Sequence, residues 1–430
     1  MSTKQRPLVL MLVLVALLVG PVLSLAQDTT SLDLFFLGDE LTNPFMEQII
    51  TDFESEHPDI DINFQTYPNE AYKTTIQVAL ASDNPPDIFF NWNGEDTGRF
   101  VREGHVLDLT AFADEYGWYD AINPAALDSF TFDGKLYGVP YSLEAKYLYY
   151  NSRVFEDQAL EVPQTFDELL GVCRTLREAG ITPMSFGNQE RWEGVHYLSM
   201  FNQKVAGEET ILQDYALETP AEELFTSPGY AGAFQRLLDM QSAGCFADAV
   251  NSTTPDAALA QFMAEQVAMY YQGTWIMGNL TTNDMQGQYG MFRMPPMTDE
   301  GAAGNQNYAL LGPIALEGAA RTENPEAVAE FLNYFISQPV QQTFVEVTNR
   351  IPVRADALVE GVGTDELRMV VEDLATTEGS VAWLDVVLES RVAEAYLNNI
   401  QEVLAGSKTP EQAVEDIRSV ALTVQEDLAQ

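Results

Sequence analysis

Cysteine, histidine and basic residues are all scarce in this chain. Its 430 residues include two Cys, three His and 21 Lys or Arg, against 65 Asp or Glu, and the net charge is −44. A chain this acidic would repel phosphates, which argues against nucleic acid as a partner. Neither Cys has a CxxC or other metal-ligand context, so we expect no metal site and no cofactor.

Two questions stay open at this level. Cys173 and Cys245 fall in the same part of the chain, but their spacing does not decide between a disulfide and two buried thiols. Acidic residues are scattered along the whole chain, which favours a highly solvated surface over an acidic cleft for a cationic ligand. A saline or acidic habitat would account for such a surface.

Long apolar runs are also rare, and the one that exists lies near the start. Two basic residues precede the run Leu8–Val19, which ends at Gly20-Pro21 and is followed by small residues up to Ala26. This pattern is typical of a signal peptide, and the run is shorter than the roughly 20 residues that span a membrane. We predict a signal peptide over 1–26, no lipid-anchor Cys, and an exported protein, periplasmic or extracellular.

The remaining chain alternates strand-like and helix-like segments. It exceeds the roughly 250–300 residues at which one core stops growing, so two lobes are expected. Strands are predicted at Leu32–Leu37, Ile60–Phe64 and Asp87–Phe90, with helices at Asn43–Glu56 and Ala71–Ala81 between them. Such a series builds a parallel sheet whose ligands lie beyond the carboxyl ends of the strands. The loops after the first and third strands are therefore expected to face a ligand.

A second series follows a turn at Asp133-Gly134. It predicts, in order, a short strand ending near Tyr141, a strand at Ala145–Tyr150, helices at Pro163–Glu178, Tyr230–Ser242 and Asp256–Glu265, a strand at Val267–Tyr271, a strand after Asn305, a helix at Pro325–Ser337, and helix from about Asp365 to the end.

Four segments carry family motifs in a fixed order. They are Asn84–Thr110, Phe132–Asn151 with Pro163–Leu169, the A-M-x-x-x-G-x-W pattern of Ala268–Trp275, and Pro325–Phe335 with Arg350–Val353 and the tail Val403–Gly406. In these segments the chain resembles the extracellular solute-binding proteins of ABC importers, in the sugar-carrying branch that includes maltose-binding protein.

The resemblance implies an α/β, two-lobe periplasmic-binding-protein fold. Its lobes would comprise residues 28–138 plus 313–349 and residues 141–306 plus 352–430. The chain would cross between them near 138–142, 305–312 and 350–353, and hinge closure would bury a ligand in the cleft between the lobes. It further implies a non-catalytic, monomeric receptor that delivers a di- or oligosaccharide to an ABC permease and meets the membrane only through that permease.

Sugar binding needs flat rings for the C–H face of a pyranose, and amides, carboxylates or Arg for its hydroxyls. The resemblance assigns stacking roles to Trp275 and Trp383, and a similar role to Trp192 in the loop 187–194. Trp92 follows the third predicted strand, whereas Trp118 has no counterpart and fits a buried core residue. The polar candidates are Asp39, Glu40, Asn91, Tyr141, Asn307 and Arg350.

Other functions find less support. Paired carboxylates are what a glycosidase needs, but the chain has no G-x-S-x-G, H-E-x-x-H or P-loop pattern, and we predict no catalytic residue. The same fold with a polyamine, a polyol or a glycerol-phosphodiester remains the alternative. The low number of basic residues disfavours an anionic cargo.

Overall fold

The computed structural model describes residues 29–298 and 301–429. The predicted signal peptide lies outside these residues. Within the described ranges, no helix is both long enough and apolar enough to cross a membrane.

A parallel βαβαβ unit opens the described chain, as the sequence predicted. It consists of β1 (Thr30–Leu37), α1 (Thr42–Glu56), β2 (Ile60–Tyr67), α2 (Asn69–Leu80) and β3 (Ile88–Trp92). β1 pairs in parallel with β2 on one side and with β3 on the other. The apolar stripe of α1 is buried, because its residues recur at the helical spacing that the sequence showed. The unit therefore places the ends of β1 and β3 side by side.

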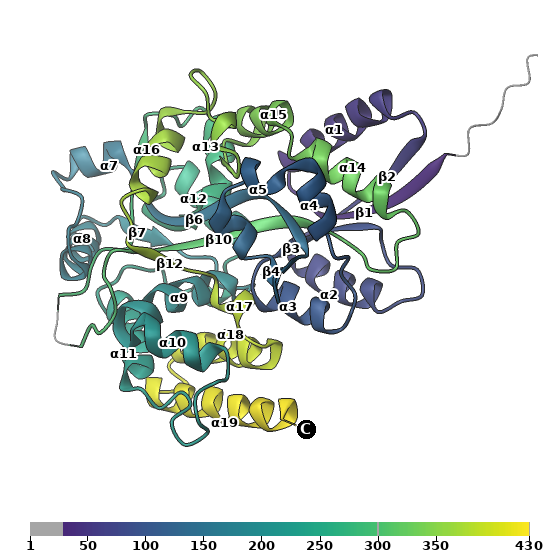
Figure 1. The fold of residues 1–430 in the computed structure, drawn as a ribbon. Helices are drawn as coiled ribbons and strands as arrows, with labels where there is room; N and C mark the ends of the chain where they lie inside the picture. The colour runs from purple at the N-terminus through teal and green to yellow at the C-terminus, as the bar shows by residue number, and fades with distance from the viewer. Residues whose placement is uncertain (1–28, 299–300, 430) are drawn as a thin grey trace, which may run out of the picture.

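Two long strands join this unit to the rest of the molecule. β6 (Gly138–Asn151) and β10 (Tyr308–Gly318) run antiparallel to each other, and β10 crosses the middle of the view in Figure 1. At one end β10 pairs with β3, and at the other end β6 pairs with β8 (Val267–Gly273) and β9 (Tyr289–Phe292). The sheet order is β2-β1-β3-β10-β6-β8-β7.

β6 corrects the prediction of two separate short strands. The polar pair Ser142 and Glu144 interrupts the apolar pattern, and for that reason the sequence suggested a break. In the structure both side chains are buried and hydrogen-bonded at the crossing, so the strand continues through them.

The apolar side chains form separate cores. The first core draws on residues between Leu32 and Tyr141 and between Ile314 and Val353. The second draws mainly on residues between Leu148 and Leu310 and on Trp383–Val424, and a smaller third core beside it begins at Ala145. Tyr141 thus packs in the first core. The exact lobe ranges given above stay a prediction.

The C-terminal part is not helical throughout, which corrects a second expectation. After α16 (Asp365–Leu374) comes β12 (Gly379–Val381), which pairs in parallel with β10, and only then α17 (Leu384–Val387), α18 (Ser390–Leu404) and α19 (Pro410–Leu428). Thr376, Thr377 and Gly379 are poor helix formers, and they separate α16 from the following helices.

The remaining elements cover the sheet and connect its strands. In the first half they are α3 (Glu95–Arg102), α4 (Thr110–Tyr116), α5 (Trp118–Ala121), α6 (Pro124–Asp128), β4 (Thr131–Phe132), β5 (Lys135–Leu136), α7 (Ser152–Asp157), α8 (Phe166–Glu178), β7 (Thr182–Ser185), α9 (Trp192–Ala206) and α10 (Glu208–Tyr215). In the second half they are α11 (Pro228–Ser242), η1 (Val250–Ser252), α12 (Pro255–Met263), η2 (Thr274–Ile276), α13 (Met277–Thr282), α14 (Pro325–Phe335), α15 (Gln338–Thr348), β11 (Ile351–Pro352) and η3 (Ala355–Ala357).

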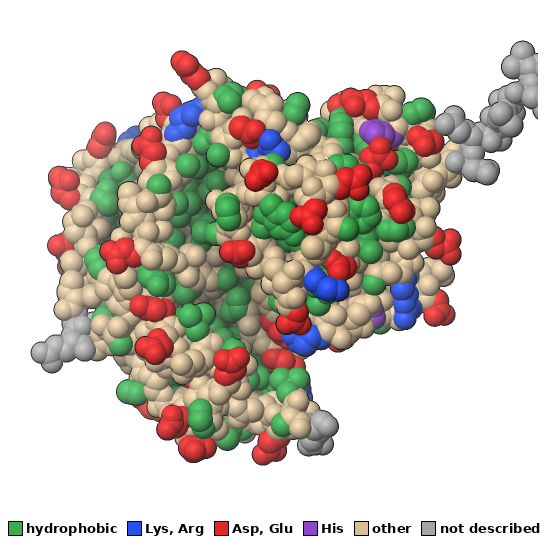
Figure 2. Space-filling model, viewed as in Figure 1, with side chains coloured by type: hydrophobic (Ala, Val, Ile, Leu, Met, Phe, Trp, Pro, Cys, Tyr) green, Lys and Arg blue, Asp and Glu red, His purple; other side chains and the backbone are tan. Residues whose placement is uncertain are grey.

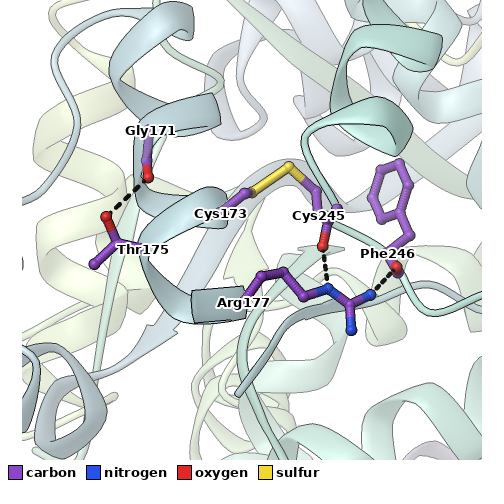
Figure 3. The surroundings of a disulfide bond; sticks show 7 residues. Gly171, Cys173, Thr175, Arg177, Cys245 and Phe246 are labelled. Carbon is purple, nitrogen blue, oxygen red and sulfur yellow. Dashed lines mark hydrogen bonds between the residues drawn. A yellow bond between two sulfur atoms is a disulfide. The ribbon is translucent and has the colours of Figure 1, made fainter. Parts of the chain in front are cut away.

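A disulfide joins Cys173 and Cys245, which settles the alternative left open by the sequence. Cys173 lies on α8 and Cys245 lies just after α11, 72 residues later (Figure 3). Beside the disulfide, the Arg177 guanidinium donates to the backbone oxygens of Gly244 and Phe246. The bond therefore ties α8 to the end of α11 within the second core.

Acidic side chains are spread over the surface. Figure 2 shows Asp and Glu scattered across the visible face, over elements that belong to different cores, with few Lys or Arg among them. This distribution agrees with a generally solvated acidic surface on that face.

Candidate ligand-binding site

Three of the five tryptophans meet at one place. Trp192 begins α9, Trp275 lies in η2, and Trp383 precedes α17. The Trp275 ring centroid lies 6.0 Å from that of Trp192 and 5.7 Å from that of Trp383, and both contacts are edge-to-face. Trp192 and Trp275 are partly exposed, whereas Trp383 is only 3% exposed. Trp192 is the first residue of a helix and not part of a loop, contrary to expectation.

Two glycines make room for these rings. A Cβ on Gly273 would lie 2.1 Å from the Trp275 ring, so this indole folds back onto the end of β8, the strand that precedes it in the chain. A Cβ on Gly312 of β10 would lie 2.4 Å from Trp383 Nε1. Each ring therefore packs directly on a glycine of a strand, where a larger residue would collide with it.

Trp92 approaches from the other lobe. It ends β3, packs edge-to-face against Phe90 at 4.8 Å, and is partly buried against both the first and the second core. The ammonium group of Lys73 on α2 lies 5.6 Å from the centroid of the Trp92 ring, a cation–π geometry. Trp92 and Lys73 thus form the side of the site that the first lobe provides.

A buried lysine lies among the indoles. Lys146 on β6 is 3% exposed, and its Nζ is 5.0 Å from the Trp275 ring and 5.2 Å from the Trp192 ring. Nζ donates to Gln272 Oε1 at 2.7 Å and lies 3.0 Å from His196 Nδ1. Burial lowers the pKa of Lys146 to about 7. Lys146 was not among the predicted site residues, because in the sequence it is a single charge within the apolar segment AKYLYY.

An acidic residue, Asp385, lies where the two lobes meet. Asp385 on α17 has its Oδ2 3.7 Å from Lys73 Nζ and its Oδ1 3.7 Å from His196 Nε2. Gly94, before α3, packs so closely on α17 that a Cβ there would be 3.0 Å from the Val386 carbonyl oxygen. The two lobes are therefore in contact here. Asp385, Lys73 and His196 were not among the predicted site residues.

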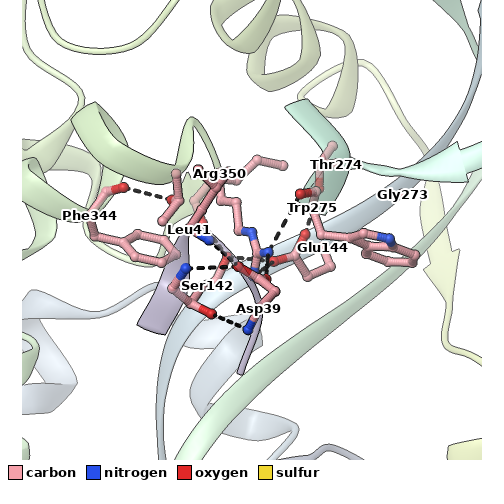
Figure 4. Close-up of polar contacts among 12 residues, drawn as sticks. Asp39, Leu41, Ser142, Glu144, Gly273, Thr274, Trp275, Phe344 and Arg350 are labelled. Carbon is pink, nitrogen blue, oxygen red and sulfur yellow. Dashed lines mark hydrogen bonds and ion pairs between the residues drawn. The ribbon is translucent and has the colours of Figure 1, made fainter. Parts of the chain in front are cut away.

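A polar network lies at the crossing of the chain (Figure 4). Arg350 donates to Asp39 Oδ2 at 2.5 Å and to the Trp275 backbone oxygen at 3.5 Å, and it lies 4.0 Å from Glu144. Glu144 in turn accepts from Thr274 at 2.8 Å. Burial raises the pKa of Asp39, but the Arg350 charge and two backbone N–H groups outweigh it, and the pKa lies below its ordinary value. Arg350 therefore connects the first lobe to the segment that carries Trp275.

The other predicted site residues lie elsewhere. Asn91 is buried and donates to Glu317 at 3.2 Å, and Tyr141 is buried in the first core. Asn307 accepts from Arg293 at 2.8 Å and lines a separate pocket of about 520 Å³. Glu40 is exposed beside Asp39. The structure thus brings together Trp192, Trp275 and Trp383, with Trp92 beside Lys73 on the first-lobe side and Asp39 and Arg350 at the adjoining crossing.

The arrangement suits a ligand with apolar ring faces and polar edges. The indoles offer flat surfaces, and Gln272, His196 and Asp385 offer donors and acceptors near them. Among residues 29–298 and 301–429, no three His, Cys, Asp or Glu side chains are grouped to hold a metal ion.

Residues 38–342 match the bacterial extracellular solute-binding protein family. The chain belongs to this family. An ABC transporter extracellular-binding protein of Pyrococcus horikoshii is 29% identical to it over 250 residues, which span 56% of this chain and only 55% of that protein. The multiple sugar-binding protein of Streptococcus mutans is 23% identical over 83% of this chain and 82% of its own.

The fold is shared with solved structures of such proteins. A structure concerned with xylan utilization by the thermophilic bacterium Caldanaerobius polysaccharolyticus has a TM-score of 0.84 at 26% identity, covering 90% of this chain and 99% of that one. The resemblance and the two-lobe α/β fold that the sequence predicted are therefore confirmed. Members of this family are binding proteins.

Proposed function

We propose that this chain is an exported receptor that binds a sugar, a di- or oligosaccharide, and delivers it to the permease of an ABC importer. The observation that carries the proposal is the meeting of three indoles, from segments far apart in sequence, beside the crossing between the lobes. Flat aromatic surfaces with nearby amide and carboxylate groups complement the apolar face and the hydroxyl rim of a pyranose. Family membership and the sugar-binding relative support the same conclusion.

The position of Lys146 favours a neutral sugar over a polyamine. An aromatic cluster attracts cations, but here the chain's own lysine Nζ occupies that position, 5.0 Å from the Trp275 ring. Lys73 brings a second amine to the same region. A polyamine would have to displace or approach two amines, whereas a neutral sugar could use their N–H groups as donors.

Delivery would follow from closure of the two lobes. The strands β6 and β10 and the segment around Arg350 cross between the cores, and bending there would separate α17 from Lys73 and open the indoles to solvent. A sugar that contacts both lobes would favour the closed form. We further propose removal of a signal peptide near Ala26, a monomeric receptor that reaches the membrane only through its permease, and no catalytic activity.

Titration of the mature protein tests this function. Isothermal calorimetry against xylo-, malto- and chito-oligosaccharides, together with spermidine and a polyol, should show saturable binding to at least one sugar and none to spermidine. The bound sugar should also raise the unfolding temperature in proportion to its occupancy. Binding of spermidine alone, or turnover of chromogenic glycosides, would contradict the proposal.

A further inference from the structure

Asp385 carries a buried oxygen without a partner. Its side chain is 8% exposed, and Oδ1 has no hydrogen-bond partner in the described part of the chain. Buried carboxylate oxygens normally accept hydrogen bonds, because an unpaired one costs the free energy of its lost hydration. The two nearby donors lie beyond hydrogen-bonding distance: His196 Nε2 is 3.7 Å from Oδ1, and Lys73 Nζ is 3.7 Å from Oδ2. Asp385 Oδ1 can therefore accept one more hydrogen bond, at the place where the two lobes meet.

The neighbouring His196 indicates which kind of group can donate to Asp385 Oδ1. Lys146 Nζ lies 3.0 Å from His196 Nδ1, and burial with the Lys146 and Lys73 charges keeps the pKa of His196 well below its ordinary value. With Lys146 as the donor of that contact, the neutral ring accepts through Nδ1 and carries its own proton on Nε2, facing Asp385. A donor and an acceptor thus lie 3.7 Å apart, too far to bond directly. One hydroxyl group can satisfy both, because it donates and accepts.

We propose that Asp385 and His196 hold one hydroxyl group of the bound sugar, which accepts from His196 Nε2 and donates to Asp385 Oδ1. The contact lies beside Trp383, whose ring is 4.6 Å from that of His196. Asp385 also faces Lys73 of the other lobe, 3.7 Å from its Oδ2, so closure brings a cation beside the carboxylate that accepts from the hydroxyl. This inference rests on the proposed function and makes Asp385 a specificity-determining residue within it.

Monodeoxy analogues provide the test. The parent sugar is the one that binds wild-type protein most tightly in the calorimetric panel, and each analogue lacks one of its hydroxyl groups. Asp385→Asn should weaken binding of the parent about tenfold or more, the usual cost of losing a charged hydrogen-bond acceptor. For one analogue, wild type and Asp385→Asn should bind with nearly equal affinity, because the hydroxyl that Asp385 accepts from is already missing.

Two further variants keep the result interpretable. His196→Gln should show its smallest loss with that same analogue, which supports the shared hydroxyl even if Asp385→Asn folds poorly. Glu372→Gln, which removes one exposed acid from α16 of the same lobe, should bind every sugar as wild type does.

The outcomes separate this inference from the proposed function. If Asp385→Asn weakens the parent and every analogue by the same factor, Asp385 acts only by pairing with Lys73 during closure, and the inference is wrong. Unchanged affinity of Asp385→Asn for the parent refutes it equally. If wild-type protein binds no sugar at all, the proposed function itself fails.

Discussion

Trp275 is the residue on which the indole cluster depends, because its ring contacts both Trp192 and Trp383. Trp275→Ala should weaken binding of the sugar by about 1–3 kcal/mol, or about 5- to 150-fold, since the ligand loses one aromatic face and its neighbours lose their support. Isothermal calorimetry measures the change. Trp118→Phe is the control: Trp118 is buried in the first core, so its replacement should lower the melting temperature and leave the affinity unchanged.

Unchanged affinity in Trp275→Ala would remove Trp275 from the site. An equal loss in both Trp variants would mean that the affinity follows general stability.

The buried carboxyl group of Glu317 should make the stability of the protein depend on pH. It is fully buried, and burial raises its pKa to about 8, although Thr97 and Asn91 oppose the shift. Thr97 Oγ1 lies 2.8 Å from the Trp92 carbonyl oxygen and 2.5 Å from Glu317 Oε1, and its single proton cannot serve both. A protonated Glu317 that donates to Thr97 resolves this conflict. The folded state therefore holds a proton that the unfolded state releases above about pH 4.5.

The sign of the effect follows from that proton. Between pH 4.5 and 8 the native state binds more protons than the unfolded state, so this contribution to the unfolding free energy falls as pH rises. Its slope is at most about 1.4 kcal/mol per pH unit. Glu317→Gln, which mimics the protonated acid, should match wild type near pH 5 and exceed its stability near pH 8, as measured by urea unfolding. A wild-type-like slope in Glu317→Gln would show that Glu317 is ionised in the native state, whereas Glu372→Gln should keep that slope.

Single residues also mark the limit of what the sequence could predict. The position of Trp275 followed from the motif A-M-x-x-x-G-x-W, and Trp383 from a late aromatic with a family counterpart. Lys146 lies within the segment Phe132–Asn151, but nothing there marked it for ligand contact, and His196 and Asp385 lie outside all four motif segments. Each is one polar residue in a largely apolar stretch. Only the folded structure shows that three distant segments bring them to one point. Asn91 is the opposite case, a residue that was predicted to contact the ligand and does not lie in the site. Its place after a predicted strand suggested the contact, but its amide donates to Glu317.

At the scale of elements, local patterns predicted most strands and helices, whereas tertiary contacts decided the rest. The parallel unit β1–α1–β2–α2–β3 was readable because its apolar residues follow the strand and helix periods. β6 was not, because Ser142 and Glu144 are buried by hydrogen bonds from other segments and not by apolar packing. β12 is only three residues long, which is too short to show a strand period in the sequence. Its pairing with β10 alone identifies it as a strand.

The disulfide is a link between elements, and its removal should affect stability more than binding. Cys173 and Cys245 join α8 to the end of α11 across 72 residues, and neither belongs to the indole cluster. The double variant Cys173→Ala/Cys245→Ala should lower the unfolding free energy by about 2–4 kcal/mol, mainly because its unfolded chain is less constrained. Urea unfolding under oxidising conditions measures the loss.

Dithiothreitol gives the internal control for this prediction. It should destabilise the wild-type protein and leave the double variant unchanged, and sugar affinity at 25 °C should stay the same in both. Equal unfolding midpoints for oxidised wild type and the double variant would show that the bond does not stabilise the fold.

At the scale of the whole molecule, the charge of −44 is the dominant feature. Scattered like charges repel one another in the compact state, and salt screens them as the Debye length falls from roughly 30 Å at 0.01 M to roughly 3 Å at 1 M. We expect the melting temperature at pH 7 to rise over this range of NaCl. Binding of a neutral sugar should change little, because its contacts are rings and hydrogen bonds and not surface charges.

Comparison of two salts distinguishes screening from a specific ion site. Screening depends on ionic strength alone, so NaCl and KCl should raise the melting temperature equally at equal concentration. Stabilisation by only one of them would instead indicate a binding site for that cation. A cleft built for a cationic ligand would behave differently again, because its affinity would fall steeply with either salt. Constant sugar affinity together with a rising melting temperature would therefore assign the acidity to the surface of the receptor and leave the indoles as the basis of recognition.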